Sequence, residues 1–232
     1  MADKKKLPVY AIKTEDGIHT LYRNDEHMQT PRALPLAVPQ EKLAQAILHE
    51  CLAQKEERLD LRTMPMTQMT LTVIDIASTQ RSAIINGIVR YGETELVCQR
   101  AADPVDLIEK QHAVWQPYLD WCKASFKADL LTGSGIVPFE QNIDALAALR
   151  AAVEVYDDYK LIGLSEAAGI SGSLVLGLAL VTGHATAKLV FEAAELDTLW
   201  QKAKWGEDPA TAARHLSIQR DLDDCVRWFS LV

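Results

Sequence analysis

The sequence predicts an α+β fold, in which a small strand-rich N-terminal domain precedes a larger bundle of α-helices. Two observations support this prediction. Residues 7–38 alternate between apolar and polar side chains and are interrupted by turns, which is typical of short strands. Most later segments repeat apolar residues at helical spacing. The run from Ile170 to Val181 is apolar on every side, as expected for the central helix of a bundle.

The first strands are predicted to form a hairpin. Two alternating runs, 8–13 and 18–23, flank the dipeptide Asp16-Gly17, and Asp-Gly between such runs is a strong hairpin signal. A third extended segment, 30–38, contains several prolines. We therefore expect it to form an edge strand or an irregular strand.

Helices are expected next. Pro39 begins one, with an apolar stripe formed by Leu43, Ala44, Ile47, Cys51 and Leu52. The charged residues 55–60 end it or form its solvated tail. Further helices are predicted at about 67–76 and 82–90, followed by a short strand at 94–100. We place the domains at residues 1–62 and 63–232. The border stays open because the strand at 94–100 could join the first domain.

The segment from Arg100 to Trp121 predicts a helix that turns a corner. Asp103 is expected to cap it, Pro104 to occupy its first position, and Pro117 to restart it. Within it, Leu107, Gln111 and Trp115 recur every four residues and so share one stripe.

The remaining chain predicts helices separated by short connections. Residues 131–138 form a loop, and helices follow from about Gln141, at 156–168 and at 170–181. Gly183 is expected to end the last of these, and Thr186 to cap a helix that reaches Trp205. Pro209 then begins a helix that runs almost to Val232.

Composition excludes several classes of protein. The net charge is −8 and the pI about 5.3, which argues against nucleic-acid binding because phosphate contacts need a basic surface. Four separated cysteines (Cys51, Cys98, Cys122 and Cys225) form no CxxC pair, so we expect buried, reduced thiols. The longest apolar run, 174–181, is too short for a bilayer. Lys4–Lys6 are followed by no signal-peptide core, so a cytoplasmic protein without membrane insertion is expected.

No catalytic or metal-binding pattern is present. The six histidines are scattered, at His19, His27, His49, His112, His184 and His215. Ser171 stands in a glycine-rich segment but lacks the spacing of a nucleophile elbow, and Gly172 to Gly177 lacks the lysine of a phosphate loop. The segment 132–135 could bind an anion through its amides, but a flexible connection is favoured. We expect no metal, no cofactor and no enzyme activity.

Acidic and aromatic residues gather in the C-terminal part. The acids, from Glu192 to Asp224, predict an ordinary solvated face; an acidic docking face for a basic partner is the alternative. The five tryptophans are expected mostly in the core. Trp205, in the sequence Trp205-Gly206-Glu207-Asp208 at a helix end, is the best physical candidate for a contact site, because tryptophan is a preferred interface anchor.

Several segments, in order, resemble the assembly chaperones of the ATP synthase α subunit, the ATP-twelve family of mitochondria and their bacterial relatives. The resemblance runs from about Leu21 to the C-terminus. The segments that carry it are Gln29-Thr30-Pro31, Leu43-Ala44 through Glu50, Met64 through Thr67, Ile74-Asp75, Cys98-x-Arg100, Pro104, Leu107, Gln111, Trp115, Pro117, Trp121, Leu176 through Leu180, Leu196-Asp197, Gln201 and Trp205-Gly206. Four positions depart from the family pattern. Cys51 replaces a tryptophan, Gln99 replaces a tyrosine, and Thr198-Leu199 stand where further acids are common.

The resemblance implies an orthogonal helical bundle after the α+β domain and a non-enzymatic chaperone that binds the unassembled α subunit. Such a protein would act as a monomer in the cytoplasm, or in the mitochondrial matrix for eukaryotic relatives, until the β subunit displaces it. The expected contact residues are Asp197, Trp200, Gln201, Trp205, Glu207 and Asp208, whereas Arg100 is expected to be structural. Reversing the charge of Asp197 and Glu207 should weaken client binding without unfolding the protein. Two alternatives remain: a small-molecule hydrolase or transferase that uses Ser171 or His112, and an interaction module for another client.

Overall fold

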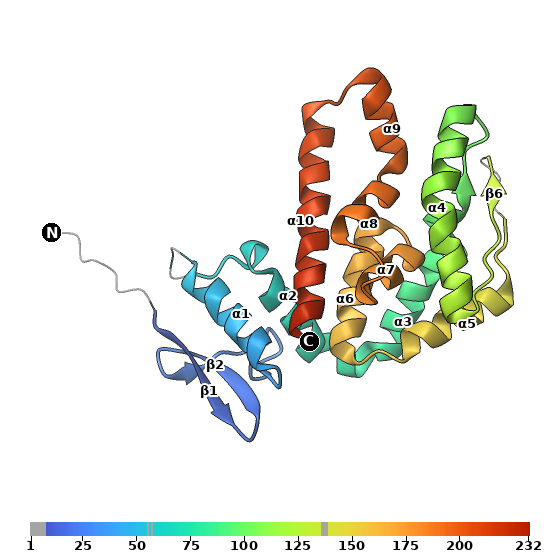
Figure 1. The fold of residues 1–232 in the computed structure, drawn as a ribbon. Coiled ribbons are helices and arrows are strands. Elements are labelled where there is room, and N and C mark those ends of the chain that lie inside the picture. Colours follow the sequence, from blue (N-terminus) through green and yellow to red (C-terminus); the bar gives the residue numbers. More distant parts are fainter. Residues whose placement is uncertain (1–7, 55, 57, 136–138) are drawn as a thin grey trace. The chain divides into compact units, whose positions relative to one another are not determined.

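The computed structural model describes residues 8–54, 56, 58–135 and 139–232 (Figure 1). The expectations for Lys4–Lys6, for Lys55 and for the end of loop 131–138 therefore concern positions outside the described residues. The contacts divide the chain into two compact units, Met1–Arg81 with Trp228–Val232, and Ser82–Arg227. These units describe how residues pack, and they do not test where one independently folding domain ends. The domain border between residues 62 and 63 therefore stays a prediction.

The first unit contains the predicted hairpin. Strands β1 (Tyr10–Glu15) and β2 (Ile18–Arg23) pair antiparallel over their full length. Asp16 and Gly17 have φ values of 50° and 78°, as a two-residue type I′ turn requires at both positions. The hairpin prediction is therefore confirmed. The extended segment 30–38 contributes only an isolated bridge between Gln29 and Pro35 and the short strand β4 (Ala37–Val38). Both β4 and β3 (Glu26–His27) pair with β2.

Helix α1 (Glu41–Leu52) covers this small sheet, because its buried stripe of Leu43, Ala44, Ile47 and Cys51 contacts β1 and β2. Leu52 was expected in the stripe but lies exposed at the end of the helix. A 3₁₀ turn (Leu61–Thr63) then leads to α2 (Pro65–Thr72). The carboxylate of Glu50 accepts the backbone N–H groups of Met66 and Thr67, both at 2.9 Å, and so caps the start of α2.

The helices predicted at 67–76 and 82–90 are not separate. Helix α2 passes into a π-helical turn (Val73–Ala77) and then into α3 (Ser78–Glu93), which kinks at Gln80. Asp75 lies in the π-helical turn, and its carboxylate accepts the Thr30 hydroxyl at 2.5 Å. This buried contact fixes the π-helical turn against the loop before β4.

The strand expected at 94–100 is mostly a 3₁₀ turn (Leu96–Cys98), followed by β5 (Gln99–Arg100). Strand β5 lies in the second unit and pairs in parallel with β6 (Gly133–Ser134). The segment 132–135 is therefore partly a paired strand and not a flexible connection. A side chain at Gly133 would collide with the Phe139 ring, which lies 2.3 Å from the ideal Cβ position.

Helix α4 (Val105–Phe126) is one continuous helix. Pro104 occupies the cap position, one residue before the first helical position predicted for it. Asp103 therefore precedes the cap, and the prediction that it caps the helix is also wrong. The predicted restart at Pro117 is also wrong. Trp115, Leu119 and Cys122, on either side of this proline, are buried. This burial holds the helix together despite the missing N–H.

The other helices of the second unit are α5 (Ile143–Glu154), α6 (Asp158–Ser171), α7 (Leu174–Val181), α8 (Ala187–Ala194), α9 (Leu196–Trp205) and α10 (Pro209–Leu231). Helix α7 is the buried central helix that the apolar run predicts, and α4, α6 and α8 contact it. Gly177 permits the close approach of α6, because a Cβ there would lie 3.2 Å from the Ala168 nitrogen. Within the described residues, no helix is both long enough and apolar enough to cross a membrane.

The expected helix from Thr186 to Trp205 is two helices, because the chain leaves helical geometry at Glu195 (φ −100°, ψ 20°). The predicted cap at Thr186 is confirmed, since its hydroxyl accepts the N–H of Leu189. Asp208 caps α10 by accepting the N–H groups of Ala210 and Thr211. All four cysteines are buried and free of disulfides, as expected.

Candidate functional site

The six expected contact residues lie on α9 and on the connection from α9 to α10. Asp197 stands in the first turn of α9 and is half-buried. Its Oδ1 accepts a hydrogen bond from the Gln111 side chain of α4 at 2.8 Å. Gln111 itself is buried and also accepts the N–H of Ala101 through its side-chain oxygen. Asp197 therefore has a structural task, which is to hold α9 against α4.

Trp200 and Trp205 form an edge-to-face pair at the end of α9. Their ring centroids are 5.5 Å apart, a separation at which perpendicular aromatic rings attract. Trp200 is buried, and its indole N–H donates to Asp106 of α4 at 3.2 Å. Trp205 is 74% exposed. The exposed Trp205 ring thus packs against the buried Trp200 ring.

The side chain of Lys204 packs against this pair. The Lys204 ammonium lies 4.0 Å from the centre of the Trp200 ring and 2.7 Å from Asp106 Oδ2. The hydrogen bond from Lys204 is the largest cause that lowers the pKa of Asp106. Asp106 therefore stays ionised and connects the first turn of α4 to the last turn of α9.

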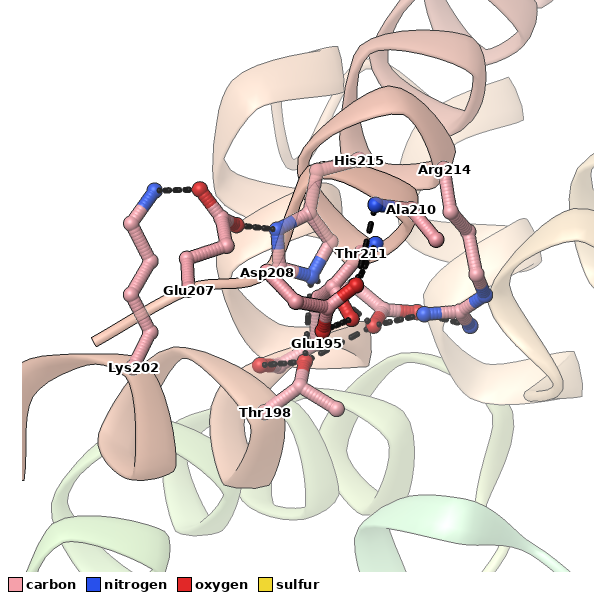
Figure 2. Close-up of polar contacts among 9 residues, drawn as sticks. All are labelled: Glu195, Thr198, Lys202, Glu207, Asp208, Ala210, Thr211, Arg214 and His215. Carbon is pink, nitrogen blue, oxygen red and sulfur yellow. Dashed lines mark hydrogen bonds and ion pairs between the residues drawn. The ribbon is translucent and has the colours of Figure 1, made fainter. Parts of the chain in front are cut away.

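Glu207, in the connection between α9 and α10, is held from both helices (Figure 2). Its Oε2 lies 2.7 Å from the Lys202 ammonium of α9. Its Oε1 lies 2.6 Å from Nδ1 of His215 on α10. The hydrogen bond to Lys202, and then that to His215, lower the pKa of Glu207. These two contacts of Glu207 hold the chain directly after Trp205 against α9 and α10.

Glu195 forms the other end of the same network (Figure 2). Arg214 of α10 donates two hydrogen bonds to its carboxylate, at 2.6 and 2.7 Å, and Thr198 donates a third at 2.8 Å. Burial raises the pKa of Glu195, but the hydrogen bonds from Arg214 and Thr198 outweigh it, and the pKa falls below its usual value. Nε2 of His215 faces the same carboxylate at 3.4 Å. The break between α8 and α9 is thus tied to α10.

Asp208 is the N-terminal cap of α10 (Figure 2). Its carboxylate accepts the N–H groups of Ala210 and Thr211 and the Thr211 hydroxyl, at 2.6 to 3.0 Å. These hydrogen bonds lower the pKa of Asp208, with the Thr211 hydroxyl as the largest cause. Asp208 is exposed, but its carboxylate already accepts hydrogen bonds from Ala210 and Thr211.

The structure therefore brings the six residues together but divides their tasks. Asp197, Trp200, Glu207 and Asp208 hold neighbouring elements in place, whereas Gln201 and Trp205 lie exposed on α9. Sequence reasoning missed Asp106 and Lys204, which both contact Trp200. Trp200 and Asp106 are 94 positions apart. No local sequence signal could have revealed that contact.

The residues considered for catalysis are not arranged for it. The Ser171 hydroxyl is buried and donates to the carbonyl oxygen of Ala167 at 2.7 Å, while His112 is exposed on α4. Within the described part of the chain, no group of three or more metal-ligating side chains comes together.

Several segments that carry the family resemblance contact one another inside the protein. Besides Thr30 with Asp75 and Glu50 with α2, the Arg100 guanidinium lies over the Trp115 ring at 5.1 Å. The Trp115 indole donates to the carbonyl of Ala193 at 2.8 Å. Arg100 is structural in this arrangement, as expected. Gln201 and Trp205 differ from these residues, because packing does not explain them.

Comparison with known proteins agrees with these observations. The family described as ATP12 chaperone protein matches residues 9–123. Atp12 from Paracoccus denitrificans is 30% identical with a TM-score of 0.90, and the match covers 98% of this chain and 97% of that one. The chain belongs to the ATP12 chaperone family.

Two further solved structures match over similar lengths. The D202K mutant of P. denitrificans Atp12p gives the same identity, coverage and TM-score. The Atu1473 protein from Agrobacterium tumefaciens is 28% identical with a TM-score of 0.88, covering 97% of this chain and 84% of that one. ATP12 proteins are assembly chaperones of the ATP synthase and not enzymes. The alternative of a hydrolase or transferase is therefore wrong, and the partner of this protein is an ATP synthase subunit.

Proposed function

We propose that this protein binds the unassembled α subunit of the soluble ATP synthase sector and releases it when the β subunit arrives. The resemblance found in the sequence and the membership of the ATP12 family support this choice of client. The observation that carries the proposal is the exposed Trp205, which packs edge-to-face against Trp200 and precedes a connection that Glu207 ties to α10. A tryptophan presented in this way is a typical anchor of a protein interface.

The mechanism needs only binding. An unassembled subunit exposes the apolar surface that its neighbour will later cover, and such surfaces aggregate. A chaperone that covers this surface with micromolar affinity, about −8 kcal/mol, can be displaced by the larger interface of the β subunit. We propose that the protein does this as a monomer in the cytoplasm. Asp197, Trp200, Gln201, Trp205, Glu207 and Asp208 would form or support the contact surface.

Isolated α and β subunits provide the test. We expect the purified chain to co-elute with the α subunit in size-exclusion chromatography and to suppress its light scattering on dilution from denaturant. The β subunit, treated identically, should show neither effect. Adding β to the complex should release the chaperone. No complex with α, together with unchanged scattering, would contradict the proposal.

A further inference from the structure

His215 of α10 lies between the two ends of α9 (Figure 2). Its Nδ1 is 2.6 Å from Oε1 of Glu207, which follows the helix. Its Nε2 is 3.4 Å from Oε2 of Glu195, which precedes the helix, and 3.2 Å from the Thr198 hydroxyl in the first turn. A single imidazole thus contacts both ends of the helix that carries Trp205.

The arrangement around this imidazole calls for a proton on each ring nitrogen. A carboxylate only accepts hydrogen bonds, and each ring nitrogen faces one. A neutral imidazole has a single N–H and can donate to Glu207 or toward Glu195, whereas an imidazolium donates to both. His215 is only 5% exposed, so water does not readily replace a lost hydrogen bond. The charged ring is therefore the form that holds both ends of α9.

Two cations are paired with the same carboxylates. Lys202 of α9 lies 2.7 Å from the carboxylate after the helix, and Arg214 of α10 donates two hydrogen bonds to the one before it. From α8 the edge of the uncharged Phe191 ring faces the imidazole, with 5.4 Å between the ring centroids. The charged groups that the described residues place around the imidazole are thus one carboxylate at each end of α9 and the cation paired with each.

We propose that His215 is a positioning residue for client binding: its imidazolium holds both ends of α9, and loss of one ring proton loosens the helix and weakens the affinity for the client. The choice of α9 and of the α subunit rests on the proposed function above. If the remaining proton stays on Nε2, Glu207 loses its donor two residues after Trp205. If it stays on Nδ1, Nε2 becomes an acceptor and draws the Thr198 hydroxyl away from Glu195, to which it donates at 2.8 Å. One end of α9 loses a hydrogen bond in either case.

Nuclear magnetic resonance of the free protein tests this arrangement without any client. With isotope-labelled histidine and tryptophan, the ring nitrogens of His215 report their protons directly, and the Trp205 indole reports the end of α9. We expect both nitrogens to carry a proton at about pH 6, and the Trp205 signal to shift with the same midpoint as the His215 ring as the pH rises to about 9. A ring that keeps one protonation state over this range, or a Trp205 signal that does not follow the ring, would overturn the inference.

The affinity of the full chain for isolated α subunit is then measured at about pH 6 and about pH 9. We expect the ratio of the two affinities to be about tenfold larger for the wild type than for His215→Gln, which cannot change its charge. Tenfold is the order of effect of losing one charge-assisted hydrogen bond. Titration of the client contributes equally to both proteins. A residue that only stabilised the fold would change the melting temperature and leave the two pH profiles parallel.

Two control variants separate this effect from other titrating groups. His112→Gln removes an exposed histidine of α4. Glu95→Gln removes a buried carboxyl group that accepts the N–H of Val175 at the start of α7. Both variants should keep the wild-type ratio of affinities. A ratio lost in Glu95→Gln and kept in His215→Gln would assign the pH dependence to Glu95 and overturn the inference.

The outcomes separate this inference from the proposed function. If the α subunit binds and the wild type and His215→Gln give the same ratio, the inference fails and the proposed function stands. If the α subunit binds at neither pH, the proposed function fails, and the resonance measurements alone decide whether the imidazolium holds α9. Should His215→Gln not fold, the wild type decides, because its affinity must then fall with the same midpoint as the His215 ring.

Discussion

Glu95 is buried at the amino end of α7, and its carboxyl group accepts hydrogen bonds from the Ser173 hydroxyl and from the N–H groups of Val97 and Val175. It thereby satisfies amides at the start of the central helix, which have no partner inside the helix. Glu50 does the same for α2 in the first unit. Sequence reasoning assigned no role to Glu95, since its partners at the start of α7, Ser173 and Val175, lie 78 and 80 positions away.

The first prediction follows from the pKa of Glu95. Burial raises it from 4.5 to about 7, although the hydrogen bonds act in the opposite direction. The folded protein therefore holds this proton more tightly than the unfolded chain. The corresponding stability is full below pH 4.5 and is lost as the pH rises through 7. Relative to Glu95→Gln, the wild type should lose about 3 kcal/mol of unfolding free energy between pH 5 and 8, measured by urea denaturation. Parallel pH profiles of the two proteins would contradict this.

At the scale of elements, a carboxylate or a helix cap joins most of the helices around the candidate site. Glu195 joins the α8–α9 break to α10, Asp197 joins α9 to α4, and Glu207 joins α9 to α10. The side chains that connect elements are thus nearly the same residues that looked free to contact a partner.

The second prediction concerns the pair of Glu195 and Arg214. Glu195 is only 7% exposed at its side chain, so Arg214→Ala leaves a mostly buried carboxylate without its two strongest hydrogen bonds. We expect a loss of about 3 kcal/mol in the free energy of unfolding, measured by urea denaturation. Lys188→Ala is the control. It removes an exposed pair with Glu192 at 3.8 Å and should cost less than about 0.5 kcal/mol.

The third prediction revises the expected effect of charge reversal. Asp197→Lys leaves the buried Gln111 amide without its acceptor, so it should lower the unfolding free energy by about 2 kcal/mol. Glu207→Lys removes the acceptor of Lys202 and His215 and places a second ammonium group beside Lys202, so it should also lower the melting temperature. Asp197→Asn keeps the acceptor and removes the charge. If this variant melts normally but binds the client weakly, the Asp197 charge touches the client directly.

Much of the fold could be predicted because its signals are local. Asp16-Gly17 determines a hairpin, the apolar run determines the buried α7, and Thr186 caps the helix that follows it. The continuation of α4 through Pro117 and the break at Glu195 depend on packing between distant segments, which overrides local preference. Trp205 could be found from the sequence because tryptophan is itself a preferred interface residue, whereas the contact of Asp106 with Trp200 could not, because 94 positions separate the two.

At the scale of the whole molecule, the chain passes from one compact unit to the other twice. It leaves the first unit after Arg81, within α3, and returns after Arg227, within α10. The first unit thus includes the segment Trp228–Val232. Trp228 in this segment is completely buried.

The fourth prediction tests that segment. Trp228→Ala should destabilise the protein by about 4 kcal/mol, because it deletes a large buried side chain and leaves a cavity. The neighbouring Val226 is 41% exposed, and Val226→Ala should cost much less. Melting temperatures from circular dichroism measure both. Equal melting temperatures for the two variants would show that Trp228 packs loosely.

The double crossing has a consequence for synthesis in the cell. Between Leu52, where α1 ends, and Trp228 lie 175 residues, which must be translated before residues 228–232 can complete their unit. The nascent N-terminal segment must wait, incompletely packed, until translation is almost over.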